Sequence, residues 1–369
     1  MKKISSAIFT ITFLVFINCK SDTRKAINPI QTQKFISFDR LIDGFLSLKP
    51  TPKKSEVKDY FNSMAKTLNK AKDKFAKFIS EKGGKTIEGK NTDTAKEDSN
   101  TVNPVDDEIN KINDMIDKMI DAANTIVETV AETTAETMGE VVEVKSSDNV
   151  STKADAKSVV EIAKGIKKIV GAAGIADKLK AEADNPTKPI IEESNNKEAG
   201  KMFSGKQGHP GGRVFYSYDI PSEIGGGANP EDINKAAEAI SAVSGEQILG
   251  AIIAAAETVE SSGATEGKNA DEATNPIEAA IGGNDNSDAT AFRDNMEKDT
   301  QIAAAIVLRG MAKNGKFAVK MGREPSGDGN TIRALVKNAA NKTVDALSKL
   351  VLKAINESLT KIAKTIKAS

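Results

Sequence analysis

The chain has 369 residues, with 52 basic and 52 acidic side chains, one cysteine, no tryptophan and only 4% aromatic residues. So few aromatics require an interior of aliphatic residues, and the abundant Ala, Lys, Ile, Val and Glu favour helices over strands. A single cysteine excludes an intramolecular disulfide. The length suffices for one large core or two modest ones.

The beginning of the chain has the pattern of an export signal. Two lysines precede an apolar run over residues 4–17, which is shorter than the roughly 20 residues that a permanent membrane helix needs. Residues 1–18 are therefore predicted to be a signal peptide, and Cys19 the lipidated first residue of the mature chain. Acylation also explains the odd cysteine. The alternative is an ordinary signal peptide, cut elsewhere, that leaves a stray thiol.

Residues 19–34 are predicted to form a lipidated tether, and residues 35–145 a set of N-terminal helices. Apolar spacing predicts a helix over residues 35–49 and a second one from Ser55 to Gly83.

Residues 83–103 are polar and are predicted to be a flexible loop. A third helix begins near Pro104, and its apolar pattern continues weakly through Met138 and Val141. Because this helix and the preceding one carry narrow apolar seams of the same period, we expect them to lie antiparallel along each other.

Residues 146–330 alternate between short helices and polar loops. The segment 184–230 holds five of the 11 prolines and is predicted to be an irregular surface excursion, with a possible short strand at 214–218. The middle of the helix predicted over residues 296–314 is apolar on every side, which indicates a buried helix. Phe317 and Val319 indicate a short extended piece, followed by a Gly-rich turn at residues 327–329. The other predicted helices cover residues 159–171, 175–183, 230–243, 248–256 and 269–281.

Residues 331–369 form one long amphipathic segment with lysines opposite its apolar face. Such a helix could lie on a membrane, but the matching seams near the N-terminus favour packing into a helical bundle. The fold class predicted from these patterns is all-α.

Charge is unevenly distributed. Residues 20–90 carry 17 Lys and Arg against 8 Asp and Glu, residues 331–369 carry 8 against 2, and residues 91–330 carry 25 against 42. If the two ends pack together, a basic zone lies beside the lipid anchor, where it could meet acidic headgroups or other polyanions, and an acidic zone lies farther out. The alternative is that the lysine-rich faces are simply solvated.

Several motifs that would indicate an enzyme are incomplete. Gly84–Lys90 resembles a phosphate-binding loop but lacks the hydroxyl residue that follows the lysine. Ser63–Lys66 and Ser147–Asn149 match two elements of penicillin-recognising enzymes, without the third. Asp285–Asp288 is acidic enough to suggest a calcium site but lacks the glycine and the closing glutamate of an EF-hand loop at the required offsets. His209 is the only histidine, so no catalytic, metal-ligating or cofactor-binding residue is predicted.

Long runs of the sequence resemble the variable major protein-like (Vmp-like) surface lipoproteins of Lyme disease Borrelia. The resemblance extends from the leader to the C-terminal helix and is weakest over Gly205–Asn229. The runs that carry it are Met1–Ile8, Phe16–Cys19, Ala242–Leu249, Asn275–Ile281 and above all Asp299–Lys320.

This resemblance implies an elongated helical bundle whose long N- and C-terminal helices pack together, with a loop-rich part away from the membrane. It also implies a surface-exposed, non-enzymatic lipoprotein of the outer membrane that serves antigenic variation and immune evasion and meets host antibodies. Residues 35–145 and 331–369 would be constant and residues 146–330 a variable, cassette-like region. The candidate variable loops are residues 85–103, 185–229, 261–271 and 282–294.

Two other functions are compatible with the sequence. An adhesin would bind sulfated host glycosaminoglycans through Lys-rich faces, and a periplasmic carrier would bind small apolar ligands. Basic residues are not interleaved with aromatics, so nucleic acid is not an expected partner.

Overall fold

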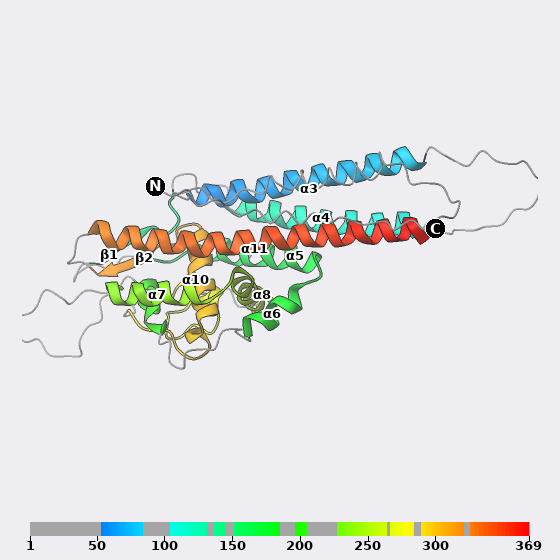
Figure 1. Cartoon of the computed structure of the whole chain (residues 1–369). Coiled ribbons are helices and arrows are strands. Elements are labelled where there is room, and N and C mark those ends of the chain that lie inside the picture. Colours follow the sequence, from blue (N-terminus) through cyan, green and yellow to red (C-terminus); the bar gives the residue numbers. More distant parts are fainter. Residues whose placement is uncertain are drawn as a thin grey trace, which may run out of the picture. The chain divides into compact units, whose positions relative to one another are not determined.

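In the computed structural model, the described residues are 53–83, 104–130, 136–144, 151–184, 196–204, 227–263, 266–283, 289–320 and 325–368. All of them belong to one compact unit, Leu41–Ser369. The helices are α3 (Lys54–Gly83), α4 (Pro104–Val130), α5 (Ala156–Ala172), α6 (Ala176–Asp184), α7 (Pro230–Ala242), α8 (Gly245–Ser262), α9 (Pro276–Ile281), α10 (Asp299–Met311) and α11 (Pro325–Ala368). The 3-10 helices η1 (Asn196–Phe203) and η2 (Asp294–Glu297) and the strands β1 (Val141–Val144) and β2 (Phe317–Lys320) complete the described elements (Figure 1).

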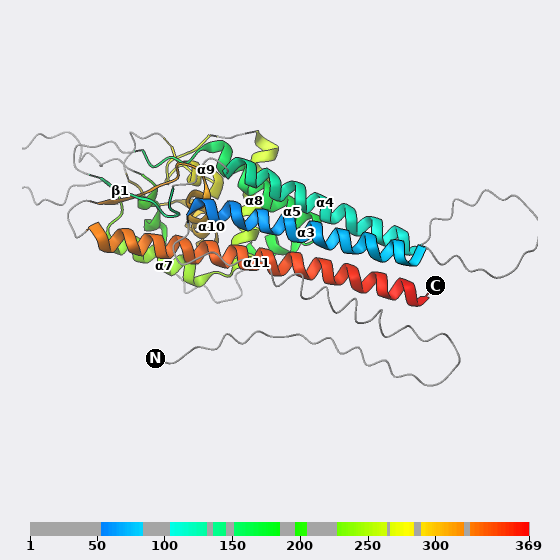
Figure 2. The same cartoon turned by 90° about the horizontal axis from the view of Figure 1, so that it is seen from above.

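The three longest helices, α3, α4 and α11, lie side by side (Figures 1 and 2). Helix α4 runs antiparallel to α3, as the matching seams predict. The side chains that form the two predicted seams are buried where their burial is described. Between α3 and α11, the Tyr60 hydroxyl donates to the carbonyl oxygen of Val344 at 2.9 Å. The predominance of helices among the described elements, with only two short strands, confirms the predicted all-α class. The buried seam residues are Val57, Phe61, Met64, Leu68 and Ala71 of α3, and Ile109, Ile112, Ile116, Met119, Ala123, Ile126 and Val130 of α4.

The shorter helices pack as a second group against this bundle. Figure 1 shows α6, α7 and α8 on the side of α11 that faces away from α3. Helix α8 contacts α5, α6 and α11, and α10 contacts α5, α7, α8, α9 and α11. A second core, centred on α10, therefore lies against the side of the long-helix bundle.

The two described strands pair in parallel, with Val141 opposite Phe317 and Val144 opposite Lys320. The expected continuation of a helix through Met138 and Val141 is wrong, because α4 ends at Val130 and Val141 begins a strand. Gly139 adopts a left-handed backbone conformation with φ of +71°, which ends any helical pattern there. The predicted extended piece at Phe317 and Val319 is confirmed as β2.

Three further expectations need correction. The segment 184–230 contains the ordered turn of helix η1, whose Ala199, Met202 and Phe203 are buried, so this part is not a surface excursion. The helix expected over residues 269–281 is only α9, preceded by turns. The Gly-rich turn expected at residues 327–329 lies inside α11, which begins at Pro325.

The predicted separation of charge is wrong for α4. This helix carries seven Asp and Glu against two Lys, yet it packs against α3, which carries eight Lys against four acidic residues. It also contacts the basic helix α11, and Lys72 of α3 pairs with Asp117 of α4. Acidic side chains of the middle of the chain therefore lie among the basic ends. The helix expected over residues 35–49, the loop over 84–103 and the strand at 214–218 lie outside the described residues.

Candidate functional site

Helix α10 is the centre of the second core. Every residue from Thr300 to Met311 is buried, which confirms the prediction of a helix apolar on every side. Small side chains at residues 303–305 allow neighbouring helices to approach closely, and Ile302, Ile306 and Leu308 fill the space between them. A helix packed on all sides cannot change its side chains without cavities or overpacking.

Arg309, in the last turn of α10, is fully buried and donates hydrogen bonds to backbone carbonyls of three other segments. Its Nε reaches the Ala280 oxygen and its Nη2 the Ala279 oxygen, both at 2.9 Å. Its Nη1 donates to the Phe203 oxygen at 2.9 Å and to the Lys316 oxygen at 3.4 Å. The last carbonyls of a helix lack partners within the helix, so one guanidinium satisfies the end of α9 and also fixes the end of η1.

Buried aromatic rings join the same segments. The Phe203 ring contacts the rings of Phe292 and Phe317 edge to face, with centroids 5.2 and 5.6 Å apart. The Phe292 N–H also donates to the Lys197 oxygen at 2.9 Å. Phe203 lies just before the polar segment 205–226, and Phe292 lies shortly after the polar segment 284–288. Each buried ring therefore anchors the chain near one end of such a segment.

The β1–β2 pair anchors the chain next to three segments, residues 145–150, 205–226 and 321–324. Ala228 adds to the other edge of β2, because its N–H donates to the Ala318 oxygen and its own oxygen accepts from the Lys320 N–H, each at 3.0 Å. Because β1 and β2 are parallel, their C-terminal ends lie at the same end of the sheet. Segments 145–150 and 321–324 begin there, and segment 205–226 ends beside β2. We call η1, α9, α10 and the β1–β2 pair, with the turns between them, the loop framework.

Helices α7 and α8, next to the loop framework, and α9, within it, begin at side-chain caps. Asn229 caps α7 and Ser244 caps α8 in reciprocal capping boxes, and Asn275 accepts hydrogen bonds from the Ile277 and Glu278 N–H groups at the start of α9. Each cap satisfies N–H groups that have no partner within the helix. These caps fix where each helix begins.

A buried ion pair ties the start of α3 to the turn between α10 and β2. The Lys54 ammonium is fully buried and lies 2.7 Å from a Glu136 carboxylate oxygen. It also donates to the Gly315 oxygen at 3.0 Å. Burial lowers the pKa of Lys54, and its hydrogen bond to Glu136 opposes that effect. Burial acts to raise the pKa of Glu136, but the hydrogen bonds from Lys54 and from the Asn314 N–H hold it below the ordinary value.

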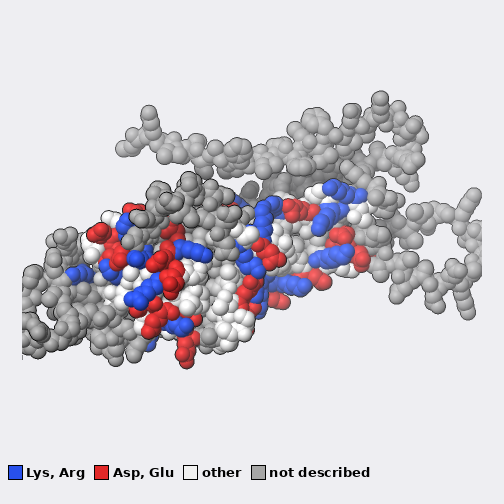
Figure 3. Space-filling view, turned by 90° about the horizontal axis from the view of Figure 1, so that it is seen from below, with Lys and Arg blue, Asp and Glu red and all other residues white. Residues whose placement is uncertain are grey.

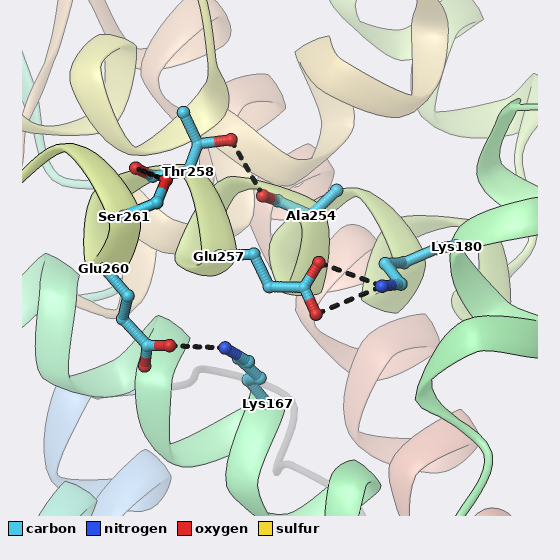
Figure 4. A network of polar contacts seen from close by, with 7 residues as sticks. All are labelled: Lys167, Lys180, Ala254, Glu257, Thr258, Glu260 and Ser261. Atoms are coloured by element: carbon cyan, nitrogen blue, oxygen red, sulfur yellow. Dashed lines mark hydrogen bonds and ion pairs between the residues drawn. The ribbon is translucent and has the colours of Figure 1, made fainter.

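Ion pairs also join the faces of α5, α6 and α8 (Figure 4). Lys167 of α5 pairs with Glu260, and Lys180 of α6 binds both carboxylate oxygens of Glu257 at 2.9 and 3.1 Å. The hydrogen bonds that the Lys180 ammonium donates to the carboxylates of Glu257 and Asp177 raise the pKa of Lys180. These pairs are partly exposed and contribute little stability each, so they orient the helices rather than form a binding site.

One face of the molecule carries mixed charge. In Figure 3, Lys and Arg side chains alternate with Asp and Glu over the visible face. A surface of this kind stays soluble but does not present one extended field of a single sign.

The predicted lipidation residue, Cys19, lies outside the described residues, as do His209, Gly84–Lys90 and Asp285–Asp288. Ser63–Lys66 lies within α3. Among the described residues, no group of three or more His, Cys, Asp or Glu is placed to hold a metal ion. Reasoning from sequence missed Arg309 and Lys54, because neither carries a motif. The only available signal was a charged residue within or beside an apolar run.

Within the described part of the chain, no single helix is both long and apolar enough to span a membrane, although α7 and α8 pass that test as a pair bent by 102°.

Comparison with known proteins gives consistent relatives. The chain is 26% identical to variable large protein 17 of Borrelia hermsii over 94% of this chain and 87% of that protein, and 26% identical to variable large protein 4 over 100% and 96%. The crystal structure of the Lyme disease variable surface antigen VlsE of Borrelia burgdorferi is 35% identical, covers 91% of this chain and 94% of that chain, and superposes with a TM-score of 0.69.

These relatives agree with the resemblance inferred from the sequence, and none has the name of an enzyme. The family model described as Borrelia lipoprotein matches residues 32–366, which is most of the chain and includes the whole loop framework. The chain therefore belongs to the Borrelia lipoprotein family.

Proposed function

We propose that this protein is a surface-exposed lipoprotein that displays exchangeable loops for antigenic variation, so that antibodies against one version fail to bind the next. The observation that carries the proposal is the enclosure of α10. Twelve consecutive buried residues and the Arg309 hydrogen bonds hold the bases of several polar segments in place. The likeness to a variable surface antigen over 91% of the chain supports the same function.

Packing supports a division into constant and variable parts. Residues 35–145 and 331–369 contain the long helices, whose buried seams resist change, and form the constant ends. Residues 146–330 contain the loop framework apart from strand β1, together with the polar segments attached to it, and form the variable region. Within this region, change is confined to exposed positions, because polar loops accept substitutions that a packed core does not.

The structure narrows the candidate variable loops. Within residues 185–229, helix η1 packs into the core through Met202 and Phe203. Within residues 261–271, Ala270 is buried, and within residues 282–294, Phe292 is buried. We therefore remove residues 196–203 from the variable set and expect these buried anchors to be retained.

In this proposal, Cys19 is the residue that anchors the protein to the membrane. After removal of residues 1–18, the acylated cysteine and the tether 19–34 would hold the protein on the outer membrane of the cell. Radiolabelled palmitate should enter the mature protein and be absent from a Cys19→Ala variant. Palmitate that failed to enter the wild type, or entered the variant equally, would overturn this arrangement.

The main test is to sequence this locus from clones before and after growth in an immunocompetent host. Changes are expected between residues 184 and 294. Residues 54–130 and 331–368 serve as the internal control, and growth in a host without antibodies gives the background rate. Unchanged residues 184–294 would reject antigenic variation.

The comparisons give no support to the adhesin alternative, and the face seen in Figure 3 carries mixed rather than uniformly basic charge. The distinguishing experiment is binding to immobilised heparin at several salt concentrations. Salt-sensitive binding that is lost on Lys→Glu changes within residues 58–82 of α3 or 337–367 of α11 would favour the adhesin.

A further inference from the structure

The turn between α10 and β2 contains Asn314-Gly315, the one Asn-Gly dipeptide in the sequence. In this dipeptide the asparagine side-chain amide is open to attack by the following backbone nitrogen, because glycine has no side chain to obstruct it. Asn314 is exposed and has a left-handed backbone with φ of +61°. A chemically reactive dipeptide therefore lies on the surface, beside the buried ion pair.

Three hydrogen bonds hold the peptide groups of this turn. A Glu136 carboxylate oxygen accepts from the Asn314 N–H at 3.0 Å. The Lys54 ammonium donates to the Gly315 oxygen at 3.0 Å, and the Gly315 N–H donates to the Ala312 oxygen at 3.4 Å. The first two bonds come from one ion pair, whose charged atoms are 2.7 Å apart. The pair therefore grips the peptide groups on both sides of the reactive bond.

The reaction needs freedom that these bonds remove. The Gly315 nitrogen must lose its proton and form a bond to the Asn314 side-chain carbonyl carbon, while the carbon–nitrogen bond of the side-chain amide breaks and ammonia leaves with that proton. Water then opens the resulting succinimide at either carbonyl and gives aspartate or isoaspartate. Ring formation requires rotation about the Asn314 Cα–C bond and release of the Gly315 N–H.

We infer that Asn314 is a site of spontaneous deamidation and that the Lys54–Glu136 pair controls its rate by holding the turn closed. The pair thus acts as a clamp on a chemical change that needs only water. Loosening of the start of α3, or of the segment around Glu136, frees the turn to rotate and lets the ring form.

The product would not fit the turn. Either product places a new carboxylate beside Glu136, which already accepts two hydrogen bonds. Isoaspartate also adds one carbon to the main chain, at a place where even a Cβ on Gly315 would lie 2.1 Å from the Arg309 oxygen. Deamidation would therefore weaken the contact between α3 and the loop framework irreversibly.

The test compares deamidation rates in the full-length protein at mildly alkaline pH, measured by mass spectrometry of chymotryptic peptides that contain residue 314. A synthetic peptide of residues 311–318 provides the unclamped rate. We expect the folded protein to react at least about tenfold more slowly than the peptide. Glu136→Gln, which removes the charge but keeps the size, should move the rate toward that of the peptide.

Glu143→Gln is the matched control, because Glu143 is exposed on the neighbouring strand β1 and takes no part in the Lys54–Glu136 pair. Its rate should equal that of the wild type. Lys54→Met is a second test of the clamp, and melting curves identify any variant that unfolds globally. A folded Glu136→Gln protein with the wild-type rate, or a wild-type protein as fast as the peptide, would overturn the inference.

Discussion

The guanidinium carbon of Arg309 lies 4.5 Å from the centroid of the Phe203 ring, and the same side chain donates to the Phe203 carbonyl oxygen at 2.9 Å. One residue of α10 thus holds both the side chain and the backbone of the last residue of η1. A cation over an aromatic face gains from the ring quadrupole, most strongly where water is excluded. The pairing explains how a charged side chain is accommodated in an otherwise apolar helix.

Arg309→Met should destabilise the protein by about 3 kcal/mol, because the carbonyls of Phe203, Ala279 and Ala280 lose a charged donor. Arg309→Lys should recover only part of this loss, since an ammonium cannot reproduce the fork geometry. Urea unfolding measures both changes. Arg333→Met, at an exposed site of α11, is the control and should change stability by less than about 0.5 kcal/mol. Equal effects at both sites would contradict the role assigned to Arg309.

Gly250→Ala should separate α8 from α6. An added Cβ would lie 2.1 Å from the Leu179 oxygen and 2.8 Å from the Ala183 Cβ, so we expect a loss of about 1–3 kcal/mol from overpacking. Gly171→Ala, in α5, has no atom within 4 Å of the new Cβ and should be neutral or gain up to about 1 kcal/mol from helix propensity. Thermal melts of the two variants are the comparison. A harmless Gly250→Ala would show that the two helices can move apart at low cost.

The Tyr60 hydroxyl should titrate only when the protein unfolds. It is buried between α3 and α11, 2.9 Å from the Val344 oxygen and 2.7 Å from the Ser348 hydroxyl oxygen, and burial raises its pKa far above the ordinary value of 10.0. Because the folded pKa exceeds the unfolded one, its contribution is complete below pH 10 and is lost as the pH rises beyond it.

Tyr60→Phe should cost about 1 kcal/mol at neutral pH and flatten the alkaline loss of stability. Phenolate absorbance compared with circular dichroism provides the check. Early titration of Tyr60 in folded protein would contradict the prediction. Tyr216 and Tyr218 lie outside the described residues, so their signal is removed by a Tyr216→Phe, Tyr218→Phe background.

Glu278 should contribute stability that disappears in acid. Burial acts to raise its pKa, but hydrogen bonds from the Thr274 N–H and hydroxyl and from Lys268 outweigh that effect and hold the pKa below the ordinary value. A lowered folded pKa gives stability that is present above the unfolded pKa and lost as the pH falls through the folded one.

Glu278→Gln should therefore weaken the protein at neutral pH and reduce the slope of stability against pH on the acid side. Urea midpoints from neutral pH down to pH 3 test this. Glu272→Gln is the control, because Glu272 lies in the turn that precedes α9 and is exposed. An unchanged acid slope in Glu278→Gln would reject the assignment.

Variants that arise by antigenic variation should keep the buried anchors of the loops. Phe203, Phe292 and Arg309 should persist, or change only to residues of similar size and character, while the exposed neighbours of Phe292 change freely. This follows because a polar replacement at a fully buried aromatic site loses its packing and leaves an unpaired polar group. Sequences of recovered clones provide the measurement. Frequent polar residues at 203 or 292 would contradict the role of the loop framework.

The helices whose buried residues recur at regular intervals could be predicted from the periodicity of apolar residues in the sequence. The seams of α3 and α4 were predictable because each buried residue follows the previous one by three or four positions, and α10 was predictable because no polar face interrupts Ile302 to Leu308. In these segments local sequence and tertiary packing agree.

The remaining elements depend on distant partners. Val141 to Val144 form a strand only because Phe317 to Lys320 lie beside them, and a short apolar run cannot by itself distinguish a strand from a helix. Helix η1 is held by the rings of Phe292 and Phe317, which are far from it in sequence. The hydrogen-bond partners of Arg309 are backbone carbonyls, which leave no mark in the sequence.

The parallel pairing of Val141 with Phe317 has a topological consequence. It makes nearly all of the proposed variable region a single closed excursion whose two ends lie on adjacent strands. Lengthening an exposed polar segment within this excursion costs little, because closure entropy rises only by about 0.6 kcal/mol for each doubling of the length of a flexible loop, and insertions are best tolerated where chain ends are close together. Genetic exchange can therefore alter the sequence and length of these exposed segments while the buried anchors and α3, α4 and α11 stay where they are.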